Sequence, residues 1–515
     1  MSSASNHPDP FLAPSAQSPT PEVVDVTPSA PQPASALEVL SWFVILGLTS
    51  LLFYSNVFVD RAENEPDPDA PSTEVINSEL VGKMFFSMSD FIKKGEKDPK
   101  KAEELAAQLG DSSDALNSGP LEQRYCAVIA TSEFKGPDAA LELLESIDQL
   151  TEDSDYKPTE RQSRLREIVG NLVAEQSANA NFDSSVIPAA DRDFLLQQLR
   201  WFGRLGLNPA GTPNVLERNE VASRAMWTTV VMLVAMAVGI LTLGIGFVGL
   251  IIAFVSFAAG RFVSQTKDQV ASGSIYVETF AIWLVLFFGF QIGLGMMVEA
   301  FNLGLRDQLF GLLVVFFGSL MVLFWPIIRG ISPGKMFDDI GWKFRNPFSE
   351  GFYGAFSYAS LTPIMGTALV LTVIGAMLFT VGSEGEELAG SGGPVHPIMG
   401  HLTSGDFMVI VFIFLSTCVA APIVEETMFR GVLFRYLRDR TGRWSRLGSV
   451  AFAAMFNSLI FASVHPQGLI GIPVLTALAV GFSLVRQWRH SLMAPMIMHA
   501  LNNFLVTTFA VMVMA

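Results

Sequence analysis

The stretch CVAAPIVEETMFRG, residues 418–431, places two adjacent glutamates at the end of an apolar run of hydrocarbon length. A charged side chain at the centre of a membrane helix costs about 2.5–3.5 kcal/mol on insertion scales, so such a pair predicts a use for at least one carboxylate. On one helix, Glu426 and Arg430 share a face and can pair, whereas Glu425 points about 100° away. The alternative is a salt-bridged helix end at the membrane surface, with Glu425 in headgroup water.

The composition is that of a membrane protein. Half of the 515 residues are hydrophobic and 16% are charged, against roughly 25% charged residues in soluble domains. Much of the formal net charge of -16 comes from the polar segment that follows the first apolar run, and this acidic balance excludes nucleic acid as an expected partner. The two cysteines, Cys126 and Cys418, lie in regions of different character, so we expect no disulfide between them.

The chain divides into four parts by composition. Residues 1–36 are rich in Pro, Ser and Ala, contain no Lys or Arg, and predict a disordered tail. Residues 37–59 predict one transmembrane helix. Residues 60–225 show helical spacing of apolar residues and few strand signals, which predicts a small, acidic, soluble helical domain for an unknown partner. Residues 226–515 form a membrane core.

Eight further spans are expected in that core. They lie near 226–260, 275–300, 308–328, 352–381, 406–425, 449–465, 469–485 and 491–513. The first is too long for one upright helix at about 1.5 Å per residue, so it predicts a tilted or kinked helix or a hairpin. One helix would place the soluble domain outside the cell, and a hairpin would keep it inside.

Basic segments set the expected orientation. Residues 329–345, 430–446 and 486–490 are rich in Lys and Arg, whereas the loop 382–406 has neither. Because Lys and Arg are retained on the cytoplasmic side, we expect the three basic loops to be cytoplasmic in a multi-pass protein of the cell (inner) membrane. His396 and His401, in the loop 382–406, are expected to be solvated.

Two histidines occur within or at the end of late apolar runs. His465 ends one span, with Phe461 one turn earlier, and His499 lies inside another, with Asn503 one turn later. A single histidine in a helix bundle is usually a packing residue, but two of them with an unpaired glutamate predict a polar pocket. The expected span limits place Glu425 and His465 at different depths, unless the helix after Glu425 continues through MFRGVLFRYL.

These side chains have the chemistry needed to hydrolyse an amide. A carboxylate and a neutral imidazole can each take a proton from water, and imidazole and carboxamide N–H groups can donate to a developing oxyanion. The same residue types could instead hold a zinc ion. The motifs H-E-x-x-H and G-x-S-x-G are absent from this region.

Three motifs carry a resemblance to a known family. EETMFR fits E-E-x-x-x-R, FASVH fits F-x-x-x-H and HALNN fits H-x-x-x-N, in this order on separate spans. Together they resemble the CPBP (CAAX protease and bacteriocin-processing, or Abi) intramembrane proteases over roughly 226–515. The resemblance implies an all-α polytopic membrane protein with an eight-helix protease core, here joined to one extra N-terminal span and a small helical soluble domain.

The resemblance also implies roles. Glu425 and His465 would activate the attacking water, and His499 and Asn503 would stabilise the oxyanion. Three residues would support the site: Glu426, Arg430 and Phe461. The family is described both as a metalloprotease and as a metal-independent glutamate protease. Zinc is therefore one expected cofactor, and its ligands would be Glu425, His465 and His499.

The expected substrate is a membrane-associated protein or peptide, and nothing in the sequence indicates a prenyl group. One alternative is a non-catalytic membrane scaffold of the same fold. Another is a transporter with a proton relay, which would need polar groups in the earlier spans, where Glu278, Gln291 and Glu299 are the main ones.

Overall fold

The computed structural model describes residues 34–58, 72–96, 116–154, 156–179, 181–259, 273–343, 346–379 and 406–514, together with 98, 100, 101 and 108. Within these residues all regular structure is helical, so the predicted all-α class is confirmed. The expected tail, up to residue 33, and His396 and His401 lie outside the described residues.

One group of helices forms a domain with its own hydrophobic core. Its elements are α2 (Thr73–Gly95), α4 (Leu121–Lys135), α5 (Pro137–Asp153), α6 (Glu160–Ala178), η3 (Ser184–Val186) and α7 (Ala189–Leu207). Fully buried side chains such as Cys126, Leu165 and Phe202 pack together in this core. Both cysteines of the chain are free, as expected, and burial raises the pKa of the Cys126 thiol well above its usual range.

Helix α7 is kinked at Arg200, where φ is 50° and ψ is -117°. A positive φ is strained for a residue with a side chain. The kink changes the direction of the helix next to Trp201 and Phe202, which pack edge to face with a ring separation of 5.2 Å. The second half of α7 continues to Leu207 and is followed by α8 (Val215–Ala258), which enters the membrane core.

The remaining helices form the membrane core. They are α1 (Ala36–Phe58), α8 (Val215–Ala258), α9 (Ile275–Phe301), α10 (Leu305–Ser319), η4 (Leu320–Leu323), α11 (Phe324–Ile328), α12 (Pro333–Ile340), α13 (Pro347–Phe379), α15 (Phe407–Leu415), η6 (Ser416–Ala420), α16 (Ala421–Glu425), η7 (Glu426–Leu433), α17 (Phe434–Arg440), α18 (Arg446–Ser463), α19 (Gly468–Arg489) and α20 (Met493–Met514). Eight helices among the described residues are long and apolar enough to cross a membrane, and Leu447–Ser463 is a shorter apolar helix. The chain is therefore a multi-pass membrane protein.

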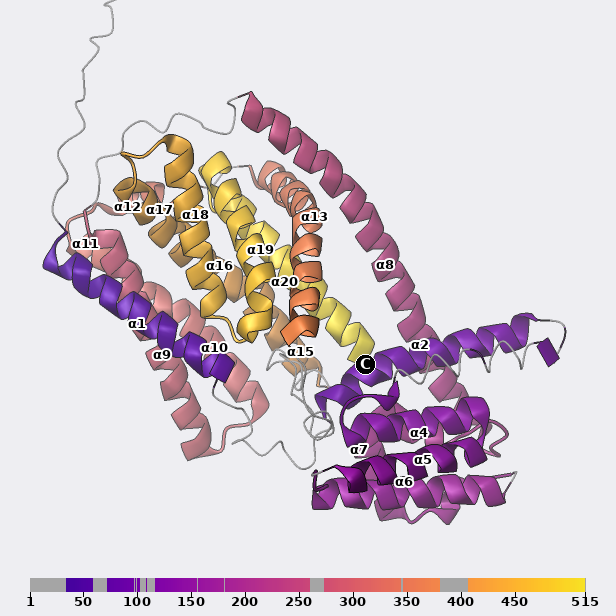
Figure 1. Cartoon of the computed structure of the whole chain (residues 1–515). Coiled ribbons are helices and arrows are strands. Elements are labelled where there is room, and N and C mark those ends of the chain that lie inside the picture. Colours follow the sequence, from indigo (N-terminus) through magenta and orange to yellow (C-terminus); the bar gives the residue numbers. More distant parts are fainter. Residues whose placement is uncertain are drawn as a thin grey trace, which may run out of the picture. The chain divides into compact units, whose positions relative to one another are not determined.

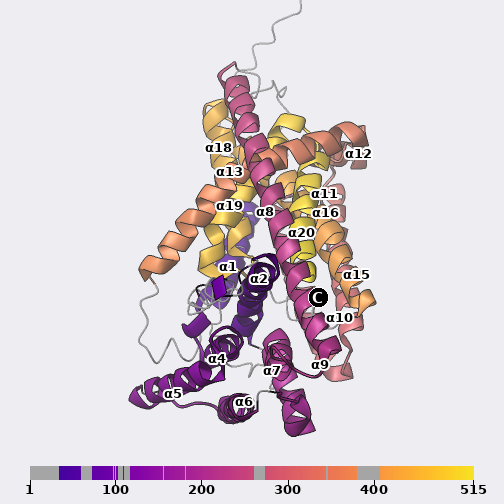
Figure 2. The same ribbon diagram turned by 90° about the vertical axis from the view of Figure 1, so that its right-hand side faces the viewer.

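Helix α8 is one continuous helix of 44 residues, so no hairpin forms at 226–260. It packs against α13, and Figure 2 shows the two helices side by side. Small residues permit this contact, because a Cβ atom at Gly249 would lie 2.0 Å from Ser360 Oγ and one at Gly246 would lie 2.4 Å from the Ala359 carbonyl oxygen. Close approach through small residues is a common basis for helix association in membranes.

The N-terminal span α1 packs against α9 and also contacts α18 and α19 (Figure 1). Near its start, Glu38 accepts hydrogen bonds from Tyr436 and from Arg440, the latter at 2.6 Å. Near its end, Asn56 Nδ2 donates to the His465 carbonyl oxygen at 3.0 Å. One helix outside the family resemblance therefore contacts both ends of the α17–α18 hairpin.

The expected span 406–425 is too short. The helical path that begins at Phe407 continues to Arg440, through two π-helical stretches at Ser416–Ala420 and Glu426–Leu433. Sequence hydropathy falls after Glu425, but every residue of Glu426–Leu433 is buried within the protein. Glu425 therefore lies inside the helix and not at its end.

The segments expected as basic loops are largely helical, which corrects the loop limits 430–446 and 486–490. Helix α17 extends to Arg440, α19 extends to Arg489, and α12 lies within 329–345. Buried Asp339 compensates several of the cations: its carboxylate accepts from Arg435 at 3.1 Å and from Tyr276 at 2.9 Å, and its carbonyl oxygen accepts from Arg486 at 3.3 Å. Because these arginines are hydrogen-bonded inside the protein, they need no contact with water, and α17 and α19 can continue as helices through the basic segments.

Candidate active site

Glu425 lies between two histidines from other helices. Its Oε2 atom is 3.7 Å from His465 Nε2 and 3.9 Å from His499 Nε2. The three residues come from α16, the turn after α18, and α20. The side chains of Glu425 and His465 are 15% and 19% exposed, and that of His499 is 6% exposed. Three of the expected site residues therefore meet in a largely buried cluster.

The main chain fixes the orientation of the His465 ring. His465 Nδ1 lies 2.6 Å from the Phe461 carbonyl oxygen, which can only accept. The proton of the neutral ring is therefore assigned to Nδ1, and the unprotonated Nε2 faces Glu425. Phe461, one helical turn earlier, also covers the imidazole with a ring separation of 4.2 Å.

The second histidine is oriented by the second glutamate. His499 Nδ1 lies 2.9 Å from Glu426 Oε1, and the same oxygen accepts from Arg430 Nη1 at 3.0 Å. The neutral His499 ring thus also carries its proton on Nδ1 and presents Nε2 to Glu425. The pairing of Glu426 with Arg430, expected from their spacing, is present, and its extension to His499 depends on the crossing of helices.

Arg430 is held by aromatic rings as well as by the carboxylate. Its guanidinium carbon lies 4.5 Å from the Phe461 ring centre and 5.1 Å from that of Phe482. Its Nη2 donates to the Ala479 carbonyl oxygen at 3.3 Å. The side chains of Arg430 and Glu426 are both fully buried. This desolvated cation–π and ionic contact joins η7, α18 and α19 beneath the cluster.

Asn503 lies one turn after His499 on α20, but its contacts differ from those of the cluster. Its Nδ2 donates to the Thr417 carbonyl oxygen at 2.7 Å, and its Oδ1 accepts from Asn502 at 3.1 Å. Thr417 is in the π-helical stretch Ser416–Ala420. The carboxamide is therefore fixed against the same helix that carries Glu425, and one of its two N–H groups remains available for a ligand.

The donor atoms suit zinc in chemical type. One carboxylate and two unprotonated Nε2 atoms converge, and each Nδ1 donates to a carbonyl or carboxylate oxygen, as histidine ligands of metals usually do. The separations of 3.7 and 3.9 Å are wider than the edge of about 3.3 Å that zinc bond lengths imply for a tetrahedron. Across the described ranges no group of three or more His, Cys, Asp and Glu side chains is arranged as a metal site.

Sequence reasoning missed several residues that hold the site together. Phe482 stacks on His499 with a ring separation of 5.3 Å, and Thr417 and Ala479 act through their main-chain oxygens. No local pattern marks these three residues. Asn56 did carry a signal, because it is a polar residue inside an apolar run that was assigned to membrane anchoring alone.

The polar residues of the earlier spans do not extend the cluster. Glu278 accepts hydrogen bonds from Trp325 at 3.1 Å and from Arg329, close to the start of α9. Glu299 is exposed at the other end of that helix, and Gln291 is partly buried between them. These contacts lend no support to a proton relay through α9.

Asn56 should affect any hydrolysis at this cluster through His465, because its side chain donates to the His465 carbonyl oxygen. Loss of one such hydrogen bond is worth about 0.5–1.5 kcal/mol, so Asn56→Ala should lower kcat by roughly 2- to 12-fold. KM and thermal stability should stay close to wild type. Exposed Leu51 of the same helix supplies the control, Leu51→Ala. An unchanged kcat in Asn56→Ala, or an equal fall in kcat for Leu51→Ala, would contradict this positioning role.

The segment that carries the cluster is similar to a known class of protein, the membrane-embedded CAAX-type proteases. Residues 407–505 match the family model described as type II CAAX prenyl endopeptidase Rce1-like. The predicted resemblance to the CPBP family is thereby confirmed for this part of the chain. The matched segment includes Glu425, His465, His499 and Asn503.

One relative is the membrane-embedded CAAX protease MroQ of Staphylococcus aureus (strain USA300). It is 35% identical over 99 residues, which are 19% of this chain and 39% of the relative. The chain thus aligns with about two fifths of that protein's length. All helices before residue 407, including α1 and α2 to α7, lie outside the match to the family model. No solved structure matches this chain.

Proposed function

We propose that the protein is an intramembrane endopeptidase that hydrolyses peptide bonds of a membrane-associated protein or peptide. The observation that carries this proposal is the convergence of Glu425 with His465 and His499 in a largely buried cluster. Structural ion pairs normally join opposite charges, whereas here three proton-accepting atoms face one another. Such an arrangement is costly for folding and suits a site that takes protons from water.

In this mechanism a water molecule binds beside Glu425 Oε2 and His465 Nε2. Glu425 and His465 Nε2 remove its proton as its oxygen attacks the scissile carbonyl carbon. The C–N bond then breaks, and the proton passes to the departing amine, so that a carboxylate and an amine leave. Glu425 Oε2 suits this role because it is buried and has no hydrogen-bond partner among the described residues.

The oxyanion requires donors. Neutral His499 has its proton on Nδ1, so it donates from Nε2 only after gaining a second proton. The Glu426 carboxylate, 2.9 Å from Nδ1, fixes the orientation of the ring for this contact. Asn503 is the second donor. One N–H of its Nδ2 group donates to the Thr417 carbonyl oxygen, and the other N–H can donate to the oxyanion. Glu426 and Arg430 act by orienting His499.

Zinc remains compatible with the same residues. Glu425, His465 and His499 would hold the ion, which when bound would polarise the attacked carbonyl and acidify water. Hydrogen bonds from Nδ1 to Phe461 and Glu426 would keep both imidazoles in the correct tautomer with or without the ion. Metal analysis of the purified protein, with cleavage measured before and after chelation, distinguishes the two forms of the mechanism.

The direct test of the proposal is cleavage of an unbiased pool of membrane peptides by the purified full-length protein. Products should form with wild type and be absent when Glu425 is replaced. The non-catalytic scaffold is the competing function, and it predicts no product that depends on Glu425. Recovery of identical products from wild type and the Glu425 variant would count against the protease.

We also propose that the basic end of the core is cytoplasmic. Arg435, Arg440 and Arg486 gather at this end, which also holds Glu38 at the start of α1 and Tyr276 at the start of α9. Helix α1 therefore leaves the cytoplasmic end, and α8 is the single crossing that returns before α9 starts. The helical domain between them should lie on the opposite, outer face of the membrane.

Cysteine labelling tests this topology. Glu145 in the helical domain and Arg443 after α17 are both exposed. With an impermeant maleimide on intact cells, Glu145→Cys should react and Arg443→Cys should react only after lysis. The native sequence is the control, since Cys126 is buried and Cys418 is half-buried. Labelling of the two variants in the reverse order would contradict the assignment.

A further inference from the structure

Three polar side chains form a hydrogen-bonded chain where α13 packs against α20. The Tyr358 hydroxyl donates to Asn502 Oδ1 at 3.3 Å, and Asn502 Nδ2 donates to Asn503 Oδ1 at 3.1 Å. Asn503 Nδ2 in turn donates to the Thr417 carbonyl oxygen at 2.7 Å. The chain therefore connects α13 to the residue that we propose as an oxyanion donor.

The direction of the hydrogen bonds is fixed at the Thr417 end. A main-chain carbonyl oxygen can only accept, so Asn503 must present Nδ2 to Thr417 and Oδ1 to Asn502. Asn502 must then donate from its own Nδ2 group and accept from the Tyr358 hydroxyl through Oδ1. Reversal of either amide would bring two acceptors or two donors together. Each link therefore favours the orientation in which Asn503 can act as a donor.

The position of Asn502 on α20 suits this contact. Asn502 and Asn503 follow His499 by three and four residues, so the three side chains share one face of the helix. The proposed chemistry uses His499 and Asn503 but not Asn502. A polar side chain in a membrane helix is costly unless it is hydrogen-bonded within the protein. Asn502 has both a donor and an acceptor in this chain, which links it to the site.

Packing brings the Tyr358 hydroxyl within reach of α20. A Cβ atom at Gly354, one turn before Tyr358, would lie 2.8 Å from Ile497 Cγ2 of α20, so the absence of a side chain permits the two helices to approach. The Tyr358 ring packs against a small core cluster that contains Phe482, the residue that stacks on the second histidine of the site. Helix packing and ring packing together therefore fix where the hydroxyl lies.

We propose that Asn502 and Tyr358 are positioning residues, which orient the Asn503 carboxamide so that its second N–H can donate to the oxyanion. This inference rests on the proposed function, because it concerns the same site. A donor to the oxyanion binds the transition state more strongly than the substrate. Loss of its orientation should therefore lower kcat and leave KM nearly unchanged.

The test is a double-mutant cycle on kcat, with the purified protein and a peptide that wild type cleaves from the membrane peptide pool. Asn502→Ala removes the bond that orients Asn503 and should lower kcat by roughly 2- to 12-fold. Asn503→Ala removes the donor itself and should lower kcat by about 10²–10³-fold. Asn502→Ala/Asn503→Ala should equal Asn503→Ala, since a positioning residue has no effect without the residue that it positions.

A second variant removes a single oxygen atom. Tyr358→Phe breaks the longest bond of the chain and should lower kcat by about 2-fold, the lower end of the range for one hydrogen bond. Because this change is small, Tyr358→Phe keeps the test decisive if Asn502→Ala fails to fold. The effect of Tyr358→Phe should likewise disappear when Asn503 is already alanine.

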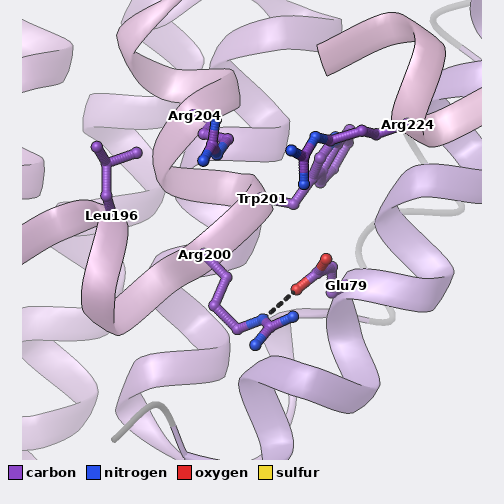
Figure 3. Close-up of a pocket in the computed structure, with 6 residues that line it drawn as sticks. All are labelled: Glu79, Leu196, Arg200, Trp201, Arg204 and Arg224. Atoms are coloured by element: carbon purple, nitrogen blue, oxygen red, sulfur yellow. Dashed lines mark hydrogen bonds and ion pairs between the residues drawn. The ribbon is translucent and has the colours of Figure 1, made fainter. Parts of the chain in front are cut away.

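Two controls lie in the helical domain. Tyr156→Phe removes a hydroxyl that donates to Gln162 Oε1 at 2.8 Å, and it matches the loss in Tyr358→Phe. Trp201→Phe removes a buried donor, the Nε1–H that binds the Val221 carbonyl oxygen at 3.2 Å. Figure 3 shows Trp201 among the residues that line a pocket of that domain. Both controls should keep the wild-type kcat per folded molecule, whatever their effect on stability.

Glu425→Gln, assayed alongside, separates the two proposals. Products that form equally with wild type and Glu425→Gln overturn the proposed function and the positioning role with it. The positioning role alone is overturned if cleavage depends on Glu425 but keeps its wild-type rate in Asn502→Ala and Tyr358→Phe. Losses that multiply in Asn502→Ala/Asn503→Ala, or an equal fall of kcat in the two controls, also overturn the positioning role.

Discussion

Glu425→Gln should abolish peptide cleavage while the protein still inserts and folds. The substitution keeps the size of the side chain and removes its ability to take a proton, and the loss of a general base lowers rates by about 10²–10⁴-fold. Thermal stability should be unchanged or higher, because an unpaired buried carboxylate is replaced by a neutral amide. Cleavage rate and unfolding temperature are measured on the same preparation.

A glutamate outside the cluster provides the matched control. Glu299 of α9 is exposed, so Glu299→Gln should cleave at the wild-type rate. If Glu425→Gln retained more than a tenth of the wild-type rate, Glu425 would not be the general base. A parallel fall in folded protein would instead assign Glu425 a structural role.

Arg430→Met should have the largest effect on stability. It removes the cation that pairs with fully buried Glu426 and leaves a charge without its partner in a desolvated site. Removal of one partner of a buried pair costs about 3–5 kcal/mol. The stacking of the guanidinium on Phe461 and Phe482 is lost at the same time. The free energy of unfolding in mixed micelles is the measured quantity.

Two further variants test whether the loss of stability in Arg430→Met comes from the unpaired buried charge. Arg430→Met/Glu426→Gln removes both charges and should recover at least half of the stability, although His499 then loses its carboxylate partner. Arg306→Met breaks the Arg306–Asp406 pair, whose arginine is 62% exposed, and should leave the free energy of unfolding nearly unchanged. Equal costs for Arg430→Met and Arg306→Met would refute the role of burial.

Hydropathy alone located most of the membrane helices, because an apolar run of bilayer length has few other folds available. It failed at Glu425, where the expected span ended and the helix continues to Arg440. A hydropathy scale scores each charged side chain as if lipid or water surrounded it. Inside this protein Glu426 forms an ion pair with Arg430, and Arg435 forms one with Asp339. Pairing inside the protein is invisible to a scale that treats residues singly.

The composition of the cluster followed from three short motifs, but its internal bonds did not. Spacing on one helix predicts that Glu426 lies near Arg430. It cannot predict that His499 of α20 reaches the same oxygen, since this depends on how two helices cross. The main-chain partners Phe461 and Thr417 are equally hidden, because a carbonyl oxygen carries no sequence signal.

The π-helical stretch Glu426–Leu433 sets the phase between the two ends of its helix. On one side of it Glu425 faces the histidines, and on the other Arg435 and Tyr436 face Asp339 and Glu38. Shortening the stretch by one residue would turn one set of contacts by about 100° relative to the other. The number of residues in Glu426–Leu433 is therefore constrained as well as their type. Insertions or deletions in this stretch should be far less tolerated than substitutions.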